Sequence, residues 1–106
     1  MLGIGIITYE RLGGCAAALA CVQQYTTCPY RLVVADDGST DGTRSYCLRQ
    51  GVQVVGRSNR GVAHNYNRAL WALRECDPII LLDSDIWPTE YEWQKRWIGA
   101  VLWICA

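Results

Sequence analysis

The sequence predicts an α/β domain, built as a three-layer α/β/α sandwich around a mostly parallel sheet. Apolar, strand-like runs alternate with helix-like runs along all 106 residues, and such alternation with short loops produces right-handed crossovers and a parallel sheet covered by helices. The fourth strand-like run, Ile79–Leu82, contains only isoleucine and leucine, which is typical of a strand buried on both faces. A chain of this length is expected to form one domain, residues 1–106.

Each element has its own signal in the sequence. The strands are short runs rich in Val, Ile and Leu, and the first helix is favoured by its Ala, Leu and Gln content. The second helix is expected to stop at Gly51, which suits a left-handed cap, and the third carries apolar residues at spacings of three and four. In chain order we expect strand Gly3–Thr8, helix Arg11–Gln24, strand Tyr30–Ala35, helix Arg44–Gln50, strand Val52–Val55, helix Val62–Glu75, strand Ile79–Leu82 and helix Thr89–Trp103.

Composition excludes several classes of protein. The formal net charge is zero and the basic residues are scattered, so no nucleic-acid-binding tract is expected. The opening residues lack the features of a signal peptide, and the late apolar run 98–106 is far shorter than the ~20 residues of a membrane span. We therefore expect a cytoplasmic protein. The six cysteines lack zinc-site spacing and are expected to be reduced and mostly buried.

Two carboxylates, Asp83 and Asp85, follow the apolar run Ile79–Leu82. In an open α/β sheet, ligands bind in the crevice outside the carboxyl ends of the strands. Residues two apart in extended backbone point to the same side, where their oxygens can bind a hard divalent cation. The alternative is a strand that ends in a solvated acidic turn.

The strand order decides whether these acids have neighbours. If the first strand is central, with strands two and three on one side and the fourth on the other, the order reverses between strands one and four. Tyr9, the acidic loop Asp36–Thr43 and Asp83–Asp85 would then converge at this switch point. We expect the ligand site there.

Four segments resemble the family 2 glycosyltransferases, enzymes of GT-A fold with a Rossmann-like sheet that use nucleotide-diphosphate sugars. They are GIITY at Gly5–Tyr9, VVADDGSTDGT at Val33–Thr43, NRGVAHNYNRAL at Asn59–Leu70 and LLDSD at Leu81–Asp85. Their order and spacing match the family across almost the whole chain. The resemblance implies the donor-binding half of an inverting hexosyltransferase.

The resemblance assigns roles to residues at the nucleotide. It places Thr8 and Tyr9 at the base and ribose, with the Tyr9 ring available for stacking. Asp37 would accept the imide N–H of uracil or thymine, which favours a UDP-sugar, because an ionised acceptor forms a stronger hydrogen bond. Arg60 or His64 could reach the nucleotide. A surface position on the third helix is an equal alternative for His64.

The resemblance also assigns the metal. Asp83 would contact the ribose or the metal, and Asp85 would bind the Mn²⁺ or Mg²⁺ that bridges the diphosphate. Asp36 is expected to hold its loop instead. Helix capping is expected for Ser39, Thr40 and Asp41.

The catalytic base has no candidate in this sequence. Family members use a carboxylate from beyond the Asp-x-Asp, and here the chain ends about twenty residues after it. We therefore expect a truncated GT-A domain without its acceptor half, whose acceptor could be a glycan, lipid or protein. Glu90 and Glu92 are expected to be solvated acids in the first turn of the last helix. The apolar face of that helix would suit packing on a partner domain.

Two other hypotheses for the function stay open. Leu81–Asp85 fits the start of a haloacid-dehalogenase-like phosphatase motif, but Trp87 occupies the position of its threonine. A non-catalytic nucleotide-binding fragment or pseudoenzyme would bind UDP with metal and transfer nothing. A dinucleotide-binding domain is disfavoured, since no third glycine follows Gly3 and Gly5 at the required place.

Overall fold

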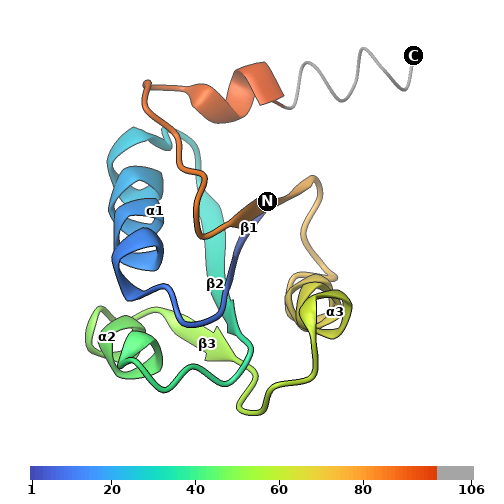
Figure 1. The fold of residues 1–106 in the computed structure, drawn as a ribbon. Coiled ribbons are helices and arrows are strands. Elements are labelled where there is room, and N and C mark those ends of the chain that lie inside the picture. The colour runs from blue at the N-terminus through green and yellow to red at the C-terminus, as the bar shows by residue number, and fades with distance from the viewer. Residues whose placement is uncertain (98–106) are drawn as a thin grey trace.

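A computed structural model describes residues 1–97, and its strands and helices alternate as the sequence predicts (Figure 1). Only the ends of the seven elements differ from the expected bounds, by a few residues. The elements are β1 (Leu2–Thr8), α1 (Leu12–Tyr25), β2 (Tyr30–Asp36), α2 (Thr43–Arg49), β3 (Gln53–Val55), α3 (Val62–Ala72) and β4 (Ile79–Asp83).

The four strands form one parallel sheet in the order β3-β2-β1-β4. Ile6 in the central strand β1 pairs with Val34 of β2 and Leu82 of β4. Because β1 lies between the two halves of the sheet, the strand order reverses beside it. The predicted three-layer architecture is confirmed, and the strand order is the one on which the expected convergence at the switch point depended.

The side-chain alternation of β1 explains the two outer layers. Helices α1 and α2 cover one face of the sheet and α3 covers the other (Figure 1). Ile6 faces α1 and α2, while Gly5 and Ile7 lie on the α3 face. A Cβ on Gly5 would lie 2.7 Å from the Leu81 side chain and 3.3 Å from the Ala69 Cβ. Glycine at this position therefore allows α3 to pack close to the sheet.

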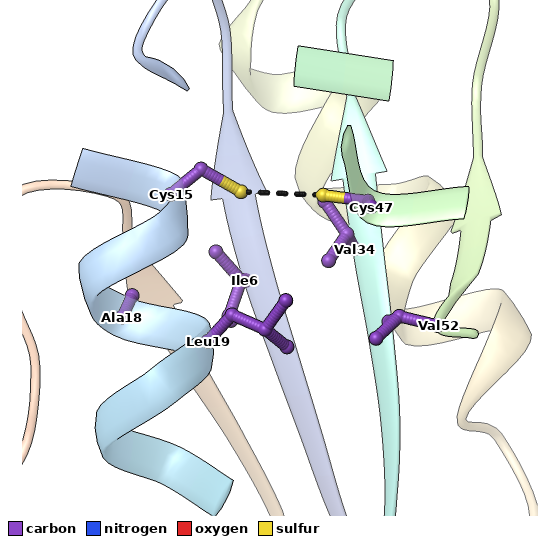
Figure 2. Packing of buried hydrophobic residues seen from close by; sticks show 7 residues of the cluster. All are labelled: Ile6, Cys15, Ala18, Leu19, Val34, Cys47 and Val52. Carbon is purple, nitrogen blue, oxygen red and sulfur yellow. Dashed lines mark hydrogen bonds between the residues drawn. The ribbon is translucent and has the colours of Figure 1, made fainter. Parts of the chain in front are cut away.

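The layer under α1 and α2 contains two facing cysteines (Figure 2). The Sγ atoms of Cys15 and Cys47 lie 3.6 Å apart, and both residues are fully buried. The hydrogen bond to Cys47 and burial raise the pKa of the Cys15 thiol. The five cysteines in the described part of the chain are free, but only two of them are buried and three are half-buried, so the expectation that they are mostly buried is wrong there. Cys105 lies outside the described residues.

The segment after β4 returns to the C-terminal end of α1. Trp93 is buried there and its Nε1 donates to Thr26 Oγ1 at 3.0 Å, while the Glu92 N–H donates to the Tyr25 carbonyl at 3.1 Å. Helical structure begins at Trp93, so the predicted start at Thr89 is wrong. Glu92 has a φ of 62°, which no helical residue adopts.

Part of the predicted apolar face is therefore already covered. Trp93 packs on the α1 side of the sheet, whereas Trp97 is 41% exposed. The rest of the predicted helix lies outside the described residues. Glu90 and Glu92 are exposed, as expected, and pair with Arg96 and Lys95. Within residues 1–97 we find no helix with the length and apolar character needed to span a membrane.

Candidate functional site

A cavity of about 440 Å³ opens at the carboxyl ends of β1, β2 and β4. This is the point where the strand order reverses, the usual place for a ligand in such a sheet. Tyr9, Asp37 and Asp83 line the same cavity, so the structure brings together the three segments that were expected to converge. The complete lining is Ile7, Thr8, Tyr9, Arg11, Asp37, Asn59, Gly61, Val62, Asn65, Asp83, Ser84 and Asp85.

Asp83 and Asp85 lie in a turn at the end of β4, which we call the Asp83–Asp85 turn. The Ile86 N–H donates to the Asp83 carbonyl at 3.0 Å, and the Ser84 N–H donates to the Ile7 carbonyl at 3.0 Å. The strand ends at Asp83, so the expectation that both acids share extended backbone is wrong. Both acids nevertheless line the cavity, because the turn that follows Asp83 directs the chain back past it.

The carboxylates of this turn are exposed to solvent. Within the described part of the chain, their one side-chain partner is Tyr66, whose hydroxyl donates to Asp83 Oδ1 at 2.5 Å. This hydrogen bond, with burial and the negative charges of Asp83 and Asp85, raises the pKa of Tyr66 to about 12. Among residues 1–97, no side chain or backbone group donates to Oδ2 of Asp83 or to the carboxylate of Asp85, which leaves these oxygens open to a ligand.

The oxygens of Asp83 and Asp85 fit a divalent cation that binds together with its substrate. Residues 1–97 contain no cluster of three or more His, Cys, Asp or Glu side chains that could hold a metal by themselves. Mg²⁺ is usually bound through one or two carboxylates plus substrate phosphates, and all-oxygen ligands also suit Mn²⁺. The residues present therefore match a cation shared with a diphosphate.

Asp37 is buried, and its carboxylate accepts three hydrogen bonds from other residues of the protein. Its Oδ1 accepts the Arg60 N–H at 2.7 Å and the Arg68 Nη1 at 3.2 Å, and its Oδ2 accepts the Gly61 N–H at 3.1 Å. The ion pair with Arg68 is almost fully removed from solvent. Asp37 thus fixes the loop between β3 and α3 against the end of β2, with one acceptor position left on Oδ2.

Arg68 extends this network from α3. Its Nη1 also donates to Asn65 Oδ1 at 3.2 Å, and its Nη2 donates to the Ser58 carbonyl at 2.8 Å. The Asn65 amide in turn donates to the Ala35 carbonyl at 2.9 Å. Helix α3 is therefore tied to the end of β2 and to the β3–α3 loop beside the cavity.

The acidic loop, residues 36–43, is held by its own side chains. Asp36 accepts the Ser39 hydroxyl at 2.5 Å and the Ser39 N–H at 3.3 Å, so its predicted loop-holding role is confirmed. Ser39 Oγ accepts the Glu10 N–H at 2.8 Å, and Thr40 donates to Glu10 Oε1. Capping by Ser39 and Thr40 is therefore wrong, because these residues bind the β1–α1 loop instead.

Asp41 accepts the first N–H group of two helices, although it is not itself the N-cap residue, which is Arg11 for α1 and Gly42 for α2. Its Oδ1 accepts the Thr43 hydroxyl and N–H at the start of α2, at 2.5 and 3.1 Å. Its Oδ2 accepts the Leu12 N–H at the start of α1, at 3.0 Å. Hydrogen bonds led by that from the Thr43 hydroxyl lower the pKa of Asp41. One side chain thus joins the N-terminal ends of both helices on this face of the sheet.

The residues predicted to bind a nucleotide divide into two groups. Thr8 and Tyr9 line the cavity with Asp37 and Asp83; Tyr9 is 48% exposed, and Thr8 Oγ1 is buried without a partner among the residues described. Arg60 and His64 are exposed and lie outside the cavity lining. These six assignments stay predictions.

Sequence reasoning missed three side chains of the site. Arg11 brings a cation to the cavity lining, Arg68 pairs with Asp37, and Tyr66 binds Asp83. The three-residue spacing of Asn65 and Arg68 on a helix could have suggested their contact. No sequence pattern links Tyr66 to Asp83, because they lie on separate elements that meet only through the fold.

The family model described as Glycosyl transferase family 2 matches residues 4–97. Among solved structures, a mannosyltransferase of Pyrobaculum calidifontis, PcManGT, in complex with GDP-Man and Mn²⁺, is similar with a TM-score of 0.73 and 25% identity. The match covers 99% of this chain and 32% of the mannosyltransferase. S. aureus TarS shares the fold with a TM-score of 0.67 at 17% identity, over 95% of this chain and 19% of TarS. No curated protein sequence matches the chain.

Proposed function

Because the chain belongs to glycosyl transferase family 2, we propose that its cavity binds a nucleotide-diphosphate sugar together with Mn²⁺ or Mg²⁺. The observation that carries this proposal is that the open carboxylates of the Asp83–Asp85 turn line the same cavity as Thr8, Tyr9 and Asp37. The mannosyltransferase in complex with GDP-Man and Mn²⁺ supports the class of donor and the kind of metal. The proposed reaction is inverting transfer of the sugar to an acceptor hydroxyl.

Asp83 and Asp85 would hold the metal. A divalent ion there would stabilise the negative charge that grows on the diphosphate when its bond to the sugar breaks. Arg11, which also lines the cavity, adds a permanent positive charge for the diphosphate. The chain thus supplies two carboxylates for the cation and one guanidinium for the anion.

We propose uracil as the base. Asp37 Oδ1 already accepts two donors, and Oδ2 accepts one, so one acceptor position is left. The imide of uracil offers a single N–H, which this position can accept. Guanine presents two adjacent donors to a carboxylate, and the second would compete with the Arg60 N–H or Arg68 for Oδ1. Tyr9, half exposed at the cavity, would stack on the base.

We assign no general base to residues 1–97. The acid expected for that role follows the Asp-x-Asp in the family, and the two acids there, Glu90 and Glu92, form ion pairs at the surface. The chain spans about a third of the length of the mannosyltransferase that it matches. The acceptor, a partner domain and the expected cytoplasmic location stay predictions.

Calorimetry of UDP binding with and without Mn²⁺ tests the donor site, with Asp85→Ala as the variant. We expect metal-dependent UDP binding in the wild type, its loss in Asp85→Ala, and weaker binding of GDP. Glu75→Ala is the matched control, because Glu75 is also an exposed acid but lies outside the cavity.

Absence of UDP and GDP binding by the folded wild type would overturn the proposed donor site. Tighter binding of GDP than of UDP would overturn only the choice of base. A chain that binds UDP with metal and transfers no sugar would be the non-catalytic nucleotide-binding fragment that the sequence leaves open.

A further inference from the structure

One side chain outside the predicted site contacts one of the two proposed metal-binding acids directly. Tyr66 lies on α3 and donates its hydroxyl to Oδ1 of Asp83, the last residue of β4, at 2.5 Å. A hydrogen bond from a hydroxyl to an ionised carboxylate belongs to the charge-assisted class. The contact joins α3 to the cavity at the position where a cation would bind.

The ring of Tyr66 is held by the core. It packs against the buried cluster of Ile7, Val33, Ala35, Ala69 and Leu73 under α3. Asp83, by contrast, is exposed at the cavity, where a carboxylate without a partner can rotate. The fixed phenol therefore restricts a carboxylate that has no other side-chain partner in the described part of the chain.

We propose that Tyr66 is a positioning residue of the donor site, which holds Asp83 by one oxygen and leaves Oδ2 for the divalent cation or the donor. The proposal rests on the proposed function, because the role requires that the cavity bind a metal and a nucleotide. Tyr66 acts through Asp83 and lies outside the cavity lining.

The expected size of the effect follows from other metal sites. Groups that hydrogen-bond a metal ligand fix its orientation, and their loss typically lowers metal affinity or activity by 10–100-fold. Removal of the Tyr66 hydroxyl would leave Asp83 free to rotate, or to bind the cation through both oxygens in a different geometry. We expect an effect near the lower end of that range, because Asp85 is untouched.

The test compares Tyr66→Phe with the wild type by calorimetry of UDP binding at a series of Mn²⁺ concentrations. We expect the Mn²⁺ concentration for half-maximal UDP binding to rise about 10-fold in Tyr66→Phe, with a much smaller change in UDP affinity at saturating Mn²⁺. Tyr46→Phe is the matched control, because Tyr46 is also partly buried in a core cluster but lies on α2, away from the cavity. Tyr46→Phe should match the wild type.

The outcomes separate this proposal from the one it rests on. A half-saturating Mn²⁺ concentration within twofold of the wild type, in a protein that binds UDP with metal, would overturn the role of Tyr66 and leave the donor site standing. Equal weakening of UDP binding at every Mn²⁺ concentration would also overturn it, since that pattern indicates general damage to the fold. A folded wild type that binds no UDP would overturn both proposals.

Discussion

The acidic loop and the Asp83–Asp85 turn leave the same edge of one sheet, yet they use their carboxylates in opposite ways. In the acidic loop, Asp36, Asp37 and Asp41 each accept several hydrogen bonds from other groups of the protein. In the turn, Tyr66 is the one side-chain partner that the described residues provide. The difference separates acids that build the site from acids that are free to bind a ligand.

The contrast has a simple physical basis. A buried carboxylate is tolerated only when its lone pairs are matched by donors, so its loss should damage the fold. An exposed carboxylate with open oxygens contributes little to folding, and its loss should damage binding alone.

The largest effect is expected at Asp37. Asp37→Ala removes the carboxylate that pairs with the largely buried guanidinium of Arg68 and that accepts two backbone N–H groups, which should lower the free energy of unfolding by about 3–5 kcal/mol. Asp85→Ala removes an exposed side chain and should change it by less than about 0.5 kcal/mol. Urea unfolding of both variants measures the two values. Equal losses in the two variants would remove the distinction between the loop and the turn.

Helix α1 approaches the Asp83–Asp85 turn closely at Gly14. A Cβ on Gly14 would lie 2.1 Å from the Ser84 carbonyl oxygen, whereas a Cβ on Gly13 would meet nothing within 4 Å. Gly14→Ala must therefore move α1 or the turn, and overpacking of this kind costs about 1–3 kcal/mol. Metal-dependent UDP binding should weaken as well, because Ser84 lies between the two acids.

Gly13→Ala is the matched control for that substitution. Gly13 lies in the first turn of α1, and alanine there should stabilise the protein by about 0.5 kcal/mol without a change in UDP binding. Urea unfolding and calorimetry of the two variants make the comparison. If Gly14→Ala behaves like Gly13→Ala, the close approach of α1 does not position the turn.

The sequence was sufficient for the fold and for the place of the site. Apolar runs and helical spacing predicted every element up to β4, and the strand order put Tyr9, Asp37 and Asp83 at one edge of the sheet. The elements depend on local periodicity, which a single sequence contains, whereas their arrangement follows from the general handedness of crossovers together with the assumption that the first strand is central. The helix predicted from Thr89 failed at its start because the segment before Trp93 instead crosses the end of α1.

The partners of individual acids could not be predicted in the same way. The expectation that Asp36 holds its loop is confirmed, but only the fold shows that Asp37 meets Arg68 while Asp41 meets Leu12. These contacts join residues 29 and 31 positions apart. The contact between Tyr66 and Asp83 has the same origin, because helix packing rather than spacing brings the two side chains together.

Asp41 tests whether an exposed acid can still be structural. Asp41→Ala removes the acceptor for the first N–H groups of α1 and α2, and loss of helix capping typically costs about 0.5–2 kcal/mol. We expect a value near the upper end because two helices are affected. Thermal and urea unfolding measure it, with the exposed Glu75→Ala as control. A loss no larger than that of the control would show that burial, and not donor count, marks the structural acids.

The smallest effect is expected in the pH dependence of stability, and it arises from the same side chain. The pKa of Asp41 is lowered in the folded state, so its contribution is present above its ordinary pKa, about 4, and is lost as the pH falls through the lowered value. Asp41→Asn should flatten the loss of stability between about pH 5 and pH 3, as read from urea midpoints at each pH. Thr43→Val removes the hydroxyl that is the main cause of the lowered pKa and should give an intermediate slope. If stability falls with pH equally in the wild type, Asp41→Asn and Thr43→Val, the hydrogen bonds of residue 41 and not the charge of Asp41 join the two helices. The acidic loop would then differ from the Asp83–Asp85 turn in hydrogen bonding alone.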